Sequence, residues 1–358
     1  MPKYRFEQIA INSTEKKKPT EEDRFTYLGL EHLDSGSLKV TRFGSDVAPI
    51  GEKLVMREGD VLFGKRRAYQ KKVAIAPFDG IFSAHGMVLR PREDVIDKDF
   101  FPLFISSDYF LDAAIKISVG SLSPTINWRD LRNLEFNLPP LEEQQKLATV
   151  LWAMNDTMES YKKLIKATED LVKSQFIARF GDPIAIEKNG EYPLLGEVCT
   201  LKAGQFVKAD DIHAEQQDDL FPCFGGNGCR GYVSSFTHYG EYPIIGRQGA
   251  LCGNVQYAAG KFHATEHAVV VTPIAEMDRY WLYHMLVLLN LNRYATGAAQ
   301  PGLAVNNLEK IHVSVPEIVL QRRFSDFAKQ SDKSKFEIEQ ALAELTATYK
   351  RIIAENLG

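Results

Sequence analysis

The fold is decided by a nine-residue stretch that the chain carries twice, first as Ser83-Ala84-His85-Gly86-Met87-Val88-Leu89-Arg90-Pro91 and again as Thr265-Glu266-His267-Ala268-Val269-Val270-Val271-Thr272-Pro273. A glycine followed by polar residues precedes both stretches at the same distance, as Gly64-Lys65-Arg66 and Gly246-Arg247-Gln248. Matches that keep their order and spacing mark an internal repeat. The chain is therefore predicted to consist of two copies of one structural unit.

The repeat extends toward both ends of each copy. Gly120 and Pro124 match Gly297 and Pro301. Further on, Leu131, Leu134, Phe136, Leu138, Pro139 and Gln144 match Leu308, Ile311, Val313, Val315, Pro316 and Gln321. The openings also agree, since Phe6-Glu7-Gln8-Ile9-Ala10 resembles Leu195-Gly196-Glu197-Val198-Cys199.

The first part of each copy has the pattern of an α+β domain. Short apolar runs at 60–63, 72–76 and 85–89 are separated by Gly, Pro and Asp, which is typical of strands and turns. A helical pattern follows at 100–116 in the first copy and at 278–294 in the second. A short strand then ends at Pro139.

The second part of each copy has the pattern of a long helix. Apolar residues recur every three or four positions, which is the heptad rhythm of a coiled coil. The seams are Leu147, Leu151, Met154, Met158, Tyr161, Ile165, Val172 and Phe176, then Phe324, Phe327, Ile338, Leu342, Leu345, Tyr349 and Ile352. Thr168 and Ser331 interrupt them. Each helix of about 38 residues would be about 57 Å long, and the two are expected to pair antiparallel.

The predicted fold is α+β, with two similar α/β domains separated by two antiparallel coiled-coil helices. The predicted boundaries are 1–138 for the first domain, 139–181 for the first helix, 182–315 for the second domain and 316–358 for the second helix. Two domains held apart by such a rod would suit two short DNA sites about 17 base pairs apart. Dimeric repressors read half-sites in this way.

Composition narrows the class of protein. The 358 residues are 44% hydrophobic and 25% charged, with a net charge of −4, which argues against a protein that simply coats DNA. No signal peptide and no apolar run long enough for a membrane span is visible, so a soluble, cytoplasmic protein without a membrane partner is expected.

The four cysteines give no metal-binding pattern. Cys199, Cys223, Cys229 and Cys252 form no C-x-x-C pair. A zinc site shared with His213 or His238 is disfavoured by the irregular spacing, and buried, inert thiols are the preferred interpretation.

No catalytic motif is found, so the chain is predicted not to be an enzyme and to hold no cofactor. Asn137-Leu138-Pro139-Pro140 superficially resembles the Asn-Pro-Pro-aromatic motif of adenine methyltransferases, but the order differs and Leu141 replaces the aromatic residue. Gly225-Gly226-Asn227-Gly228 lacks the Gly-Lys-Ser/Thr that completes a P-loop. A tight turn is the better interpretation.

Candidate DNA contacts follow the repeated glycines. In the first domain they are Lys65, Arg66, Arg67, Tyr69, Gln70, Lys71 and Lys72. Arginine can hold guanine through O6 and N7, glutamine can pair with adenine, and lysine more often meets phosphate. The equivalent loop of the second domain, Arg247-Gln248-Gly249, has fewer charges and predicts fewer phosphate contacts.

Further candidates stand at repeated or turn positions. His85 and His267 match each other, and a scaffold role and a base contact are equally supported for them. The remaining candidates are Ser121, Ser123 and Gln300 in loops before proline, with Asn227 and Arg230 in the glycine-rich turn. For all loop positions the alternative is a set of solvated charges with no ligand.

Three groups of motifs together resemble the specificity subunits of type I restriction-modification systems. Pro139-Pro140-Leu141-Glu142-Glu143-Gln144-Gln145, the long helix and Phe176-Ile177-Ala178-Arg179-Phe180-Gly181 resemble their central conserved region. Tyr27-Leu28-Gly29-Leu30-Glu31-His32-Leu33 and Gly59-Asp60-Val61-Leu62-Phe63-Gly64-Lys65-Arg66-Arg67 resemble their first target-recognition domain. The second domain and the last helix resemble the distal half, although Pro316-Glu317-Ile318-Val319-Leu320-Gln321-Arg322 lacks the second proline and the Glu-Glu-Gln run.

This resemblance implies a non-catalytic subunit that binds double-stranded DNA and reads a bipartite target, one half for each domain. It also implies two methyltransferase subunits, which carry S-adenosylmethionine, and restriction subunits, which use ATP and Mg²⁺. Exposed positions at the start of the first long helix (142–146) would face these partners, or would simply form a helix N-terminus that favours Glu.

Three other functions remain open at this point. One is a protein-binding scaffold without DNA readout, and another is a specificity-like subunit of a related methylation-based defence system. A self-contained nuclease or methyltransferase is the third, and the absence of a cofactor loop or acidic metal cluster in the sequence disfavours it.

Overall fold

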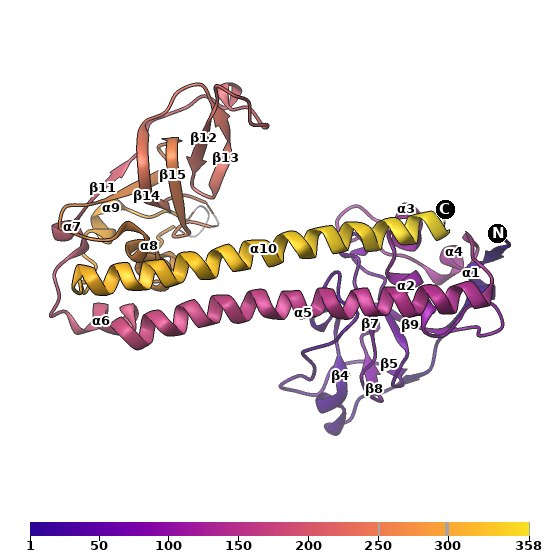
Figure 1. The fold of residues 1–358 in the computed structure, drawn as a ribbon. Coiled ribbons are helices and arrows are strands. Elements are labelled where there is room, and N and C mark those ends of the chain that lie inside the picture. Colours follow the sequence, from indigo (N-terminus) through magenta and orange to yellow (C-terminus); the bar gives the residue numbers. More distant parts are fainter. Residues whose placement is uncertain (250, 298–300, 358) are drawn as a thin grey trace. The chain divides into compact units, whose positions relative to one another are not determined.

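The computed structural model describes residues 1–249, 251–297 and 301–357, which form two compact units (Figure 1). The first unit contains Met1–Lys162 together with the end of the chain from Gln340, and the second contains Lys163–Glu339. Each unit therefore combines one α/β domain with about half of each long helix. The boundaries predicted from the sequence instead give each domain and each helix as a separate, consecutive range.

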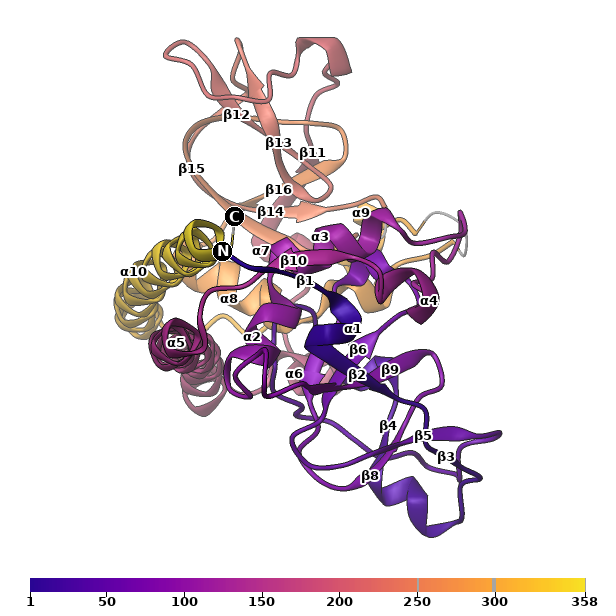
Figure 2. The ribbon, with the colours of Figure 1, turned by 90° about the vertical axis from the view of Figure 1, so that its right-hand side faces the viewer.

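The first unit contains two four-stranded sheets and a strand pair. One sheet has the order β2 (Ala10–Ser13), β9 (Gly86–Pro91), β6 (Val61–Gly64), β7 (Val73–Ile75), and its first three strands lie side by side in Figure 2. The other has the order β3 (Lys16–Lys17), β5 (Lys53–Met56), β8 (Gly80–Phe82), β4 (Tyr27–Leu28). The pair consists of β1 (Lys3–Arg5) and β10 (Glu135–Asn137).

Short helices complete the first domain, and one prediction about them was wrong. The domain contains α1 (Phe6–Ile9), α2 (Phe100–Ser106), α3 (Asp108–Lys116), α4 (Trp128–Leu131) and 3-10 turns at Glu22–Thr26, Leu30–His32 and Ala68–Gln70. The predicted helix 100–116 is two helices, because Ser107 is extended and its hydroxyl accepts a hydrogen bond from the Phe110 N–H, which starts α3. The rings of Phe6, Phe104, Phe110 and Phe136 pack together in the core.

The second unit contains one six-stranded sheet. Its order is β11 (Cys199–Ala203), β16 (Ala268–Pro273), β14 (His238–Gly246), β15 (Val255–Ala264), β12 (Phe221–Gly225), β13 (Gly228–Val233). Its helices are α6 (Pro183–Asn189), α7 (Leu195–Val198), α8 (Arg279–Leu288) and α9 (Val305–Leu308), with 3-10 turns at Ala209–Asp211 and Leu291–Tyr294. The predicted helix 278–294 ends early, because Asn290 has a left-handed backbone with φ of 51°.

The predicted repeat is confirmed by hydrogen bonds that occur at equivalent places in both domains. The Gly64 N–H donates to the Lys72 carbonyl at 2.9 Å, and the Gly246 N–H donates to the Asn254 carbonyl at 2.9 Å. Three further pairs agree: Gly86 to Ser83 with Ala268 to Thr265, Arg92 to Ile9 with Ile274 to Val198, and Phe6 to Leu134 with Leu195 to Ile311. The two copies therefore share a backbone even where their side chains differ.

The two long helices, α5 (Leu141–Phe180) and α10 (Ile318–Leu357), have 40 residues each and run antiparallel within each unit. In the first unit Leu151 and Ile353 lie in one buried cluster, and the Thr346 hydroxyl lies 3.4 Å from the Met158 sulfur. In the second unit the Phe176 and Phe324 rings are 5.1 Å apart. Among the described residues, no helix is both long and apolar enough to cross a membrane.

A buried glutamine lies at the start of each long helix. The Gln144 side chain, 1% exposed, accepts a hydrogen bond from the Asp97 N–H at 2.8 Å and donates to the carbonyls of Val95 and Pro139. Gln321 repeats this arrangement with the Asp278 N–H at 2.8 Å and the Pro316 carbonyl at 2.6 Å. The expectation that Gln144 is exposed toward a partner was therefore wrong, because its amide satisfies buried backbone groups of its own domain.

We predict that Gln144→Met lowers the free energy of unfolding by about 2–4 kcal/mol, because it leaves buried backbone groups without hydrogen-bond partners. Methionine keeps the size of the side chain but removes its donor and acceptor. Urea denaturation of the whole chain measures the change. Gln145→Met is the matched control, since Gln145 is exposed. Equal stability of the two variants would contradict this role for Gln144.

Candidate nucleic-acid interface

In the first domain, three of the candidate residues form one cluster. The Arg66 Nε donates to the Ser123 hydroxyl at 3.0 Å, and an Arg66 terminal nitrogen lies 3.4 Å from His85 Nε2. The backbone joins the same segments, since the Arg66 N–H donates to the His85 carbonyl at 3.3 Å. Arg66 follows β6, His85 precedes β9 and Ser123 lies between α3 and α4, so three distant segments meet here.

The segment that carries Ser123 is a closed loop. Val119 and Thr125 exchange two backbone hydrogen bonds of 3.0 and 2.9 Å, and the Ile126 N–H donates to the Lys65 carbonyl at 2.9 Å. Gly120 has φ of 111°, a conformation that favours glycine and permits the sharp bend. The loop is thus anchored to the end of β6, with Ser121 exposed beyond its base.

The cluster favours the neutral form of His85. Burial lowers the pKa of His85 first, and the cations of Arg66, Lys65 and Lys53 lower it further. Since a guanidinium can only donate hydrogen bonds, the Nε2 that faces Arg66 acts as the acceptor and Nδ1 carries the proton. The cluster therefore presents hydrogen-bond donors in a field of positive charge.

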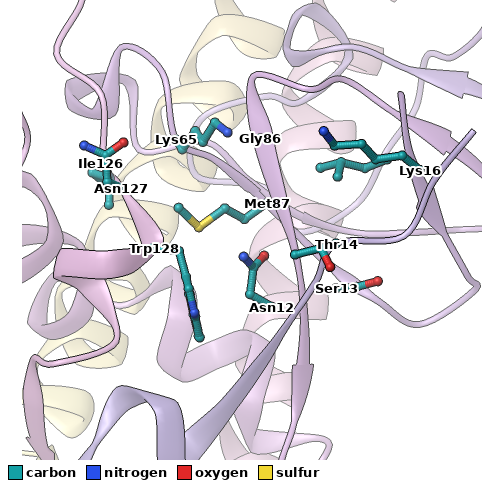
Figure 3. A pocket seen from close by; sticks show the side chains of 11 residues that line it. Asn12, Ser13, Thr14, Lys16, Lys65, Gly86, Met87, Ile126, Asn127 and Trp128 are labelled. Carbon is teal, nitrogen blue, oxygen red and sulfur yellow. The ribbon is translucent and has the colours of Figure 1, made fainter. Parts of the chain in front are cut away.

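Lys65 lies beside a small cavity of about 170 Å³, shown in Figure 3. Asn12, Lys16, Asn127 and Trp128 are among the residues that line it. Burial and the Lys16 ammonium lower the pKa of Lys65, so two cations lie near one another at this opening. Sequence reasoning missed Lys16, although the run Lys16-Lys17-Lys18 was a visible signal.

The five other candidates of this segment divide into two groups. Arg67, which has φ of 54°, is exposed, and Tyr69 is 56% exposed, whereas Gln70 is half-buried. Lys71 forms ion pairs of 2.7 Å with both Asp108 and Asp112, and Lys72 donates to the Leu30 carbonyl at 2.6 Å. Burial alone would lower the pKa of Lys71, but the two carboxylates outweigh it and raise that pKa. Both lysines therefore already have partners within the first unit.

The second domain gathers its candidates at the equivalent place. The Arg247 N–H donates to the His267 carbonyl at 3.0 Å, and Gln248 forms a β-bridge with Gly302. The turn between β12 and β13 packs against the end of β14, since a Cβ on Gly246 would lie 1.9 Å from the Gly226 carbonyl oxygen. That turn carries Asn227, and Arg230 follows on β13; both are exposed. Gln300 lies outside the described residues.

The second cluster contains a carboxylate that the first lacks. Glu266 Oε1 lies 3.1 Å from His267 Nε2, whereas the residue before His85 is Ala84. Sequence reasoning missed Glu266, although the aligned repeat shows the exchange of Ala for Glu. The two domains thus place different charges on one shared backbone arrangement.

In the part of the chain that the structure describes, no group of three or more His, Cys, Asp or Glu side chains is arranged to hold a metal ion. Cys199, Cys223 and Cys252 are buried, and Cys229 is exposed. Burial raises the pKa of Cys199 to about 12, so this thiol stays protonated.

The fold defines a class of protein in which one α/β domain, followed by one long helix, occurs twice. The sequence model of the family described as "Type I restriction modification DNA specificity domain" matches residues 12–169 and again residues 188–346. The chain therefore belongs to this family and carries two of its domains. Specificity subunits of these systems are non-catalytic, which agrees with the prediction that the chain is not an enzyme.

Curated relatives carry the same description. The chain is 49% identical over 136 residues to the type I restriction enzyme EcoprrI specificity subunit of Escherichia coli, and the match covers 38% of this chain and 34% of that one. It is 26% identical over 214 residues to the EcoDI specificity subunit of the same organism, covering 58% and 48%. The chain thus spans between a third and a half of the length of these relatives.

Solved structures show the same fold. The S subunit of a type I restriction-modification system from M. genitalium aligns over 100% of this chain and 96% of its own, with a TM-score of 0.64 and 16% identity. A chain from a study of complex assembly and conformational transition of the type I system aligns over 99% and 97%, with a TM-score of 0.53 and 20% identity. The predicted α+β fold with an internal repeat is confirmed.

We predict that Arg66→Met raises the pKa of His85, because it removes a cation that disfavours the imidazolium. A pH titration of the His85 ring signals by NMR measures the shift. Arg67→Met is the control, since Arg67 is exposed and is not among the cations that act on His85. A midpoint that stays unchanged in Arg66→Met, or moves equally in both variants, would contradict the described cluster.

Proposed function

We propose that the chain is the DNA-reading subunit of a type I restriction-modification enzyme and that each domain reads one half of a bipartite target. The observation that carries this proposal is the pair of clusters at equivalent places of the repeat. Arg66, Ser123 and His85 form the first. Arg247, Gln248 and His267, joined by Glu266, form the second.

The chemistry of the clusters suits base readout. Arginine donates to guanine O6 and N7, glutamine pairs with adenine N6 and N7, and serine suits either kind of edge. The chain as a whole has a net charge of −4, so DNA would be attracted by these local fields and not by overall charge. The carboxylate of Glu266 makes the second surface less positive than the first. Two unlike half-sites are the expected consequence.

The long helices suit the binding of partner subunits. α5 and α10 contribute to both units, and one side of each helix remains exposed along its length. We propose that these sides bind two methyltransferase subunits that carry S-adenosylmethionine, and restriction subunits that use ATP and Mg²⁺. The length of the helices, about 60 Å each, would then set the spacer between the half-sites. Such an assembly would work in the cytoplasm, where its DNA substrate lies.

Adenine methylation tests this function directly. The chain is coexpressed with the methyltransferase subunit of its system, and methylated adenines are sequenced across a plasmid library. Two short, unlike sequences with a fixed spacer are the expected target. A stable complex that binds S-adenosylmethionine but methylates no defined target would contradict the proposal and favour a protein-binding scaffold.

We predict that Arg66→Ala combined with Arg67→Ala relaxes or abolishes recognition of one half of that target only. Arg247→Ala should affect only the other half, because its side chain belongs to the other domain. Loss of one specific base contact reduces discrimination by about tenfold or more. Arg92→Ala is the control for loss of an arginine from the same domain, since Arg92 is exposed and lies beyond the far end of β9 from His85. Relaxation of both halves by one variant would contradict the assignment of one domain to one half-site.

A further inference from the structure

An exposed leucine projects from the loop that carries Ser123. Leu122 is 94% exposed, so a partner that covers it gains the free energy of burying a large aliphatic side chain. Its neighbours Ser121 and Ser123 are polar, so the leucine stands alone between two hydroxyl groups. A side chain in this position becomes buried only when another molecule covers it.

The loop holds Leu122 in a defined place. The paired backbones of Val119 and Thr125 close its base at 3.0 and 2.9 Å, and the Ala68 N–H donates to the Pro124 carbonyl at 3.2 Å. Arg66 clamps the loop from the side through the Ser123 hydroxyl at 3.0 Å. The leucine is thus fixed one residue from a side chain that contacts the guanidinium of Arg66.

The surroundings of this loop indicate what covers Leu122. The cations of Arg66, Lys65 and Lys53 all act on His85, and His85 itself lies 3.4 Å from Arg66. A partner that fits must combine negative charge with an apolar surface within a few ångströms. DNA meets both requirements, since its phosphates are anionic and its bases present methyl groups and flat faces. An uncharged protein surface would leave the cations unmatched.

We propose that Leu122 makes an apolar contact with a base of the first half-site and is a specificity-determining residue; this rests on the proposed function of the first domain. The contact is either with the 5-methyl group of a thymine in the major groove or with the faces of a base step that the side chain enters. Both bury the leucine against a base. By the offset of the repeat, the second domain has Ala299 at this position, so the contact belongs to the first half-site alone.

The test uses the complex of the full chain with its methyltransferase subunit and a duplex that contains the methylated target. Leu122→Ala should weaken binding about tenfold or more, because the buried side chain is lost. The slope of log affinity against log salt should stay unchanged, because an apolar contact releases no counterions. Arg66→Ala should make that slope less steep, because one cation fewer is near the DNA. Leu122→Met should largely restore binding, since it keeps an apolar side chain of similar size.

Two changes in the DNA distinguish the two kinds of contact. Replacing a first-half thymine by uracil removes only its methyl group, and should weaken the wild-type complex but not Leu122→Ala if that methyl is the contact. A 2-aminopurine placed in the first half should increase in fluorescence on binding of the wild type, and not of the variant, if the leucine unstacks a base step.

Ile274→Ala is the control, because it removes another exposed aliphatic side chain. Ile274 is 63% exposed and lies beyond the opposite end of β16 from His267.

Three results would overturn the inference in different ways. Wild-type affinity in Leu122→Ala, with Arg66→Ala weakened, would leave the reading function intact and remove Leu122 from it. Loss of the methyltransferase subunit from the Leu122→Ala complex would show a protein contact in place of a base contact. A wild-type complex that does not distinguish its target from other DNA would overturn the proposed function, and the inference with it.

Discussion

A glutamine side chain, buried at the first turn of each long helix, ties that helix to the domain that precedes it. Gln144 and Gln321 each accept a backbone N–H from the segment before α2 or α8, and each donates to the carbonyl of the proline that ends the domain. Because buried polar groups are costly to leave unpaired, the amide can hold its place only when the helix start and the domain meet correctly. The packing of Leu151 with Ile353 in one unit, and of Phe176 with Phe324 in the other, depends on these hydrogen bonds to place the helix start.

The same shared backbone carries two different surfaces. The segment after each repeated glycine pairs with the residue that follows a repeated proline, as Arg66 with Thr125 and Gln248 with Gly302. Around this constant frame the first domain places cations near a neutral His85, while the second places Glu266 against His267. Duplication followed by change of a few loop side chains therefore suffices to give one molecule two unlike sites.

Much of the fold could be predicted from the sequence because its signals are repeated or periodic. The paired histidines, glycines and prolines indicated two copies, and the heptad positions indicated helices that end near Phe180 and Leu357. Local interruptions were missed, since the break at Ser107 depends on a cap hydrogen bond and the end of α8 on the backbone of Asn290. Gln144 looked like one of several polar residues at a helix start, and only the packed domain shows that it is buried.

The site was less predictable than the fold because its long side chains contact residues that are far apart in the sequence. Lys71 stands among other cations in the sequence, yet Asp108 and Asp112 on α3 bind it. Conversely, Lys16 joins Lys65 from a distant strand, and Ser123 joins Arg66 from a distant loop. The exposure of Leu122 could not be predicted either, because the sequence around a single leucine in a loop does not show whether its side chain is exposed or buried.

The most direct test of one domain for one half-site is photo-crosslinking to the methylated target. A p-azidophenylalanine replaces Ser121 in one sample and Gln248 in another, both of which are exposed positions beside the clusters. The account predicts that the first probe crosslinks only to bases of one half-site and the second only to bases of the other. Crosslinks from both positions to the same half, or from neither position in a complex that still methylates its target, would contradict it.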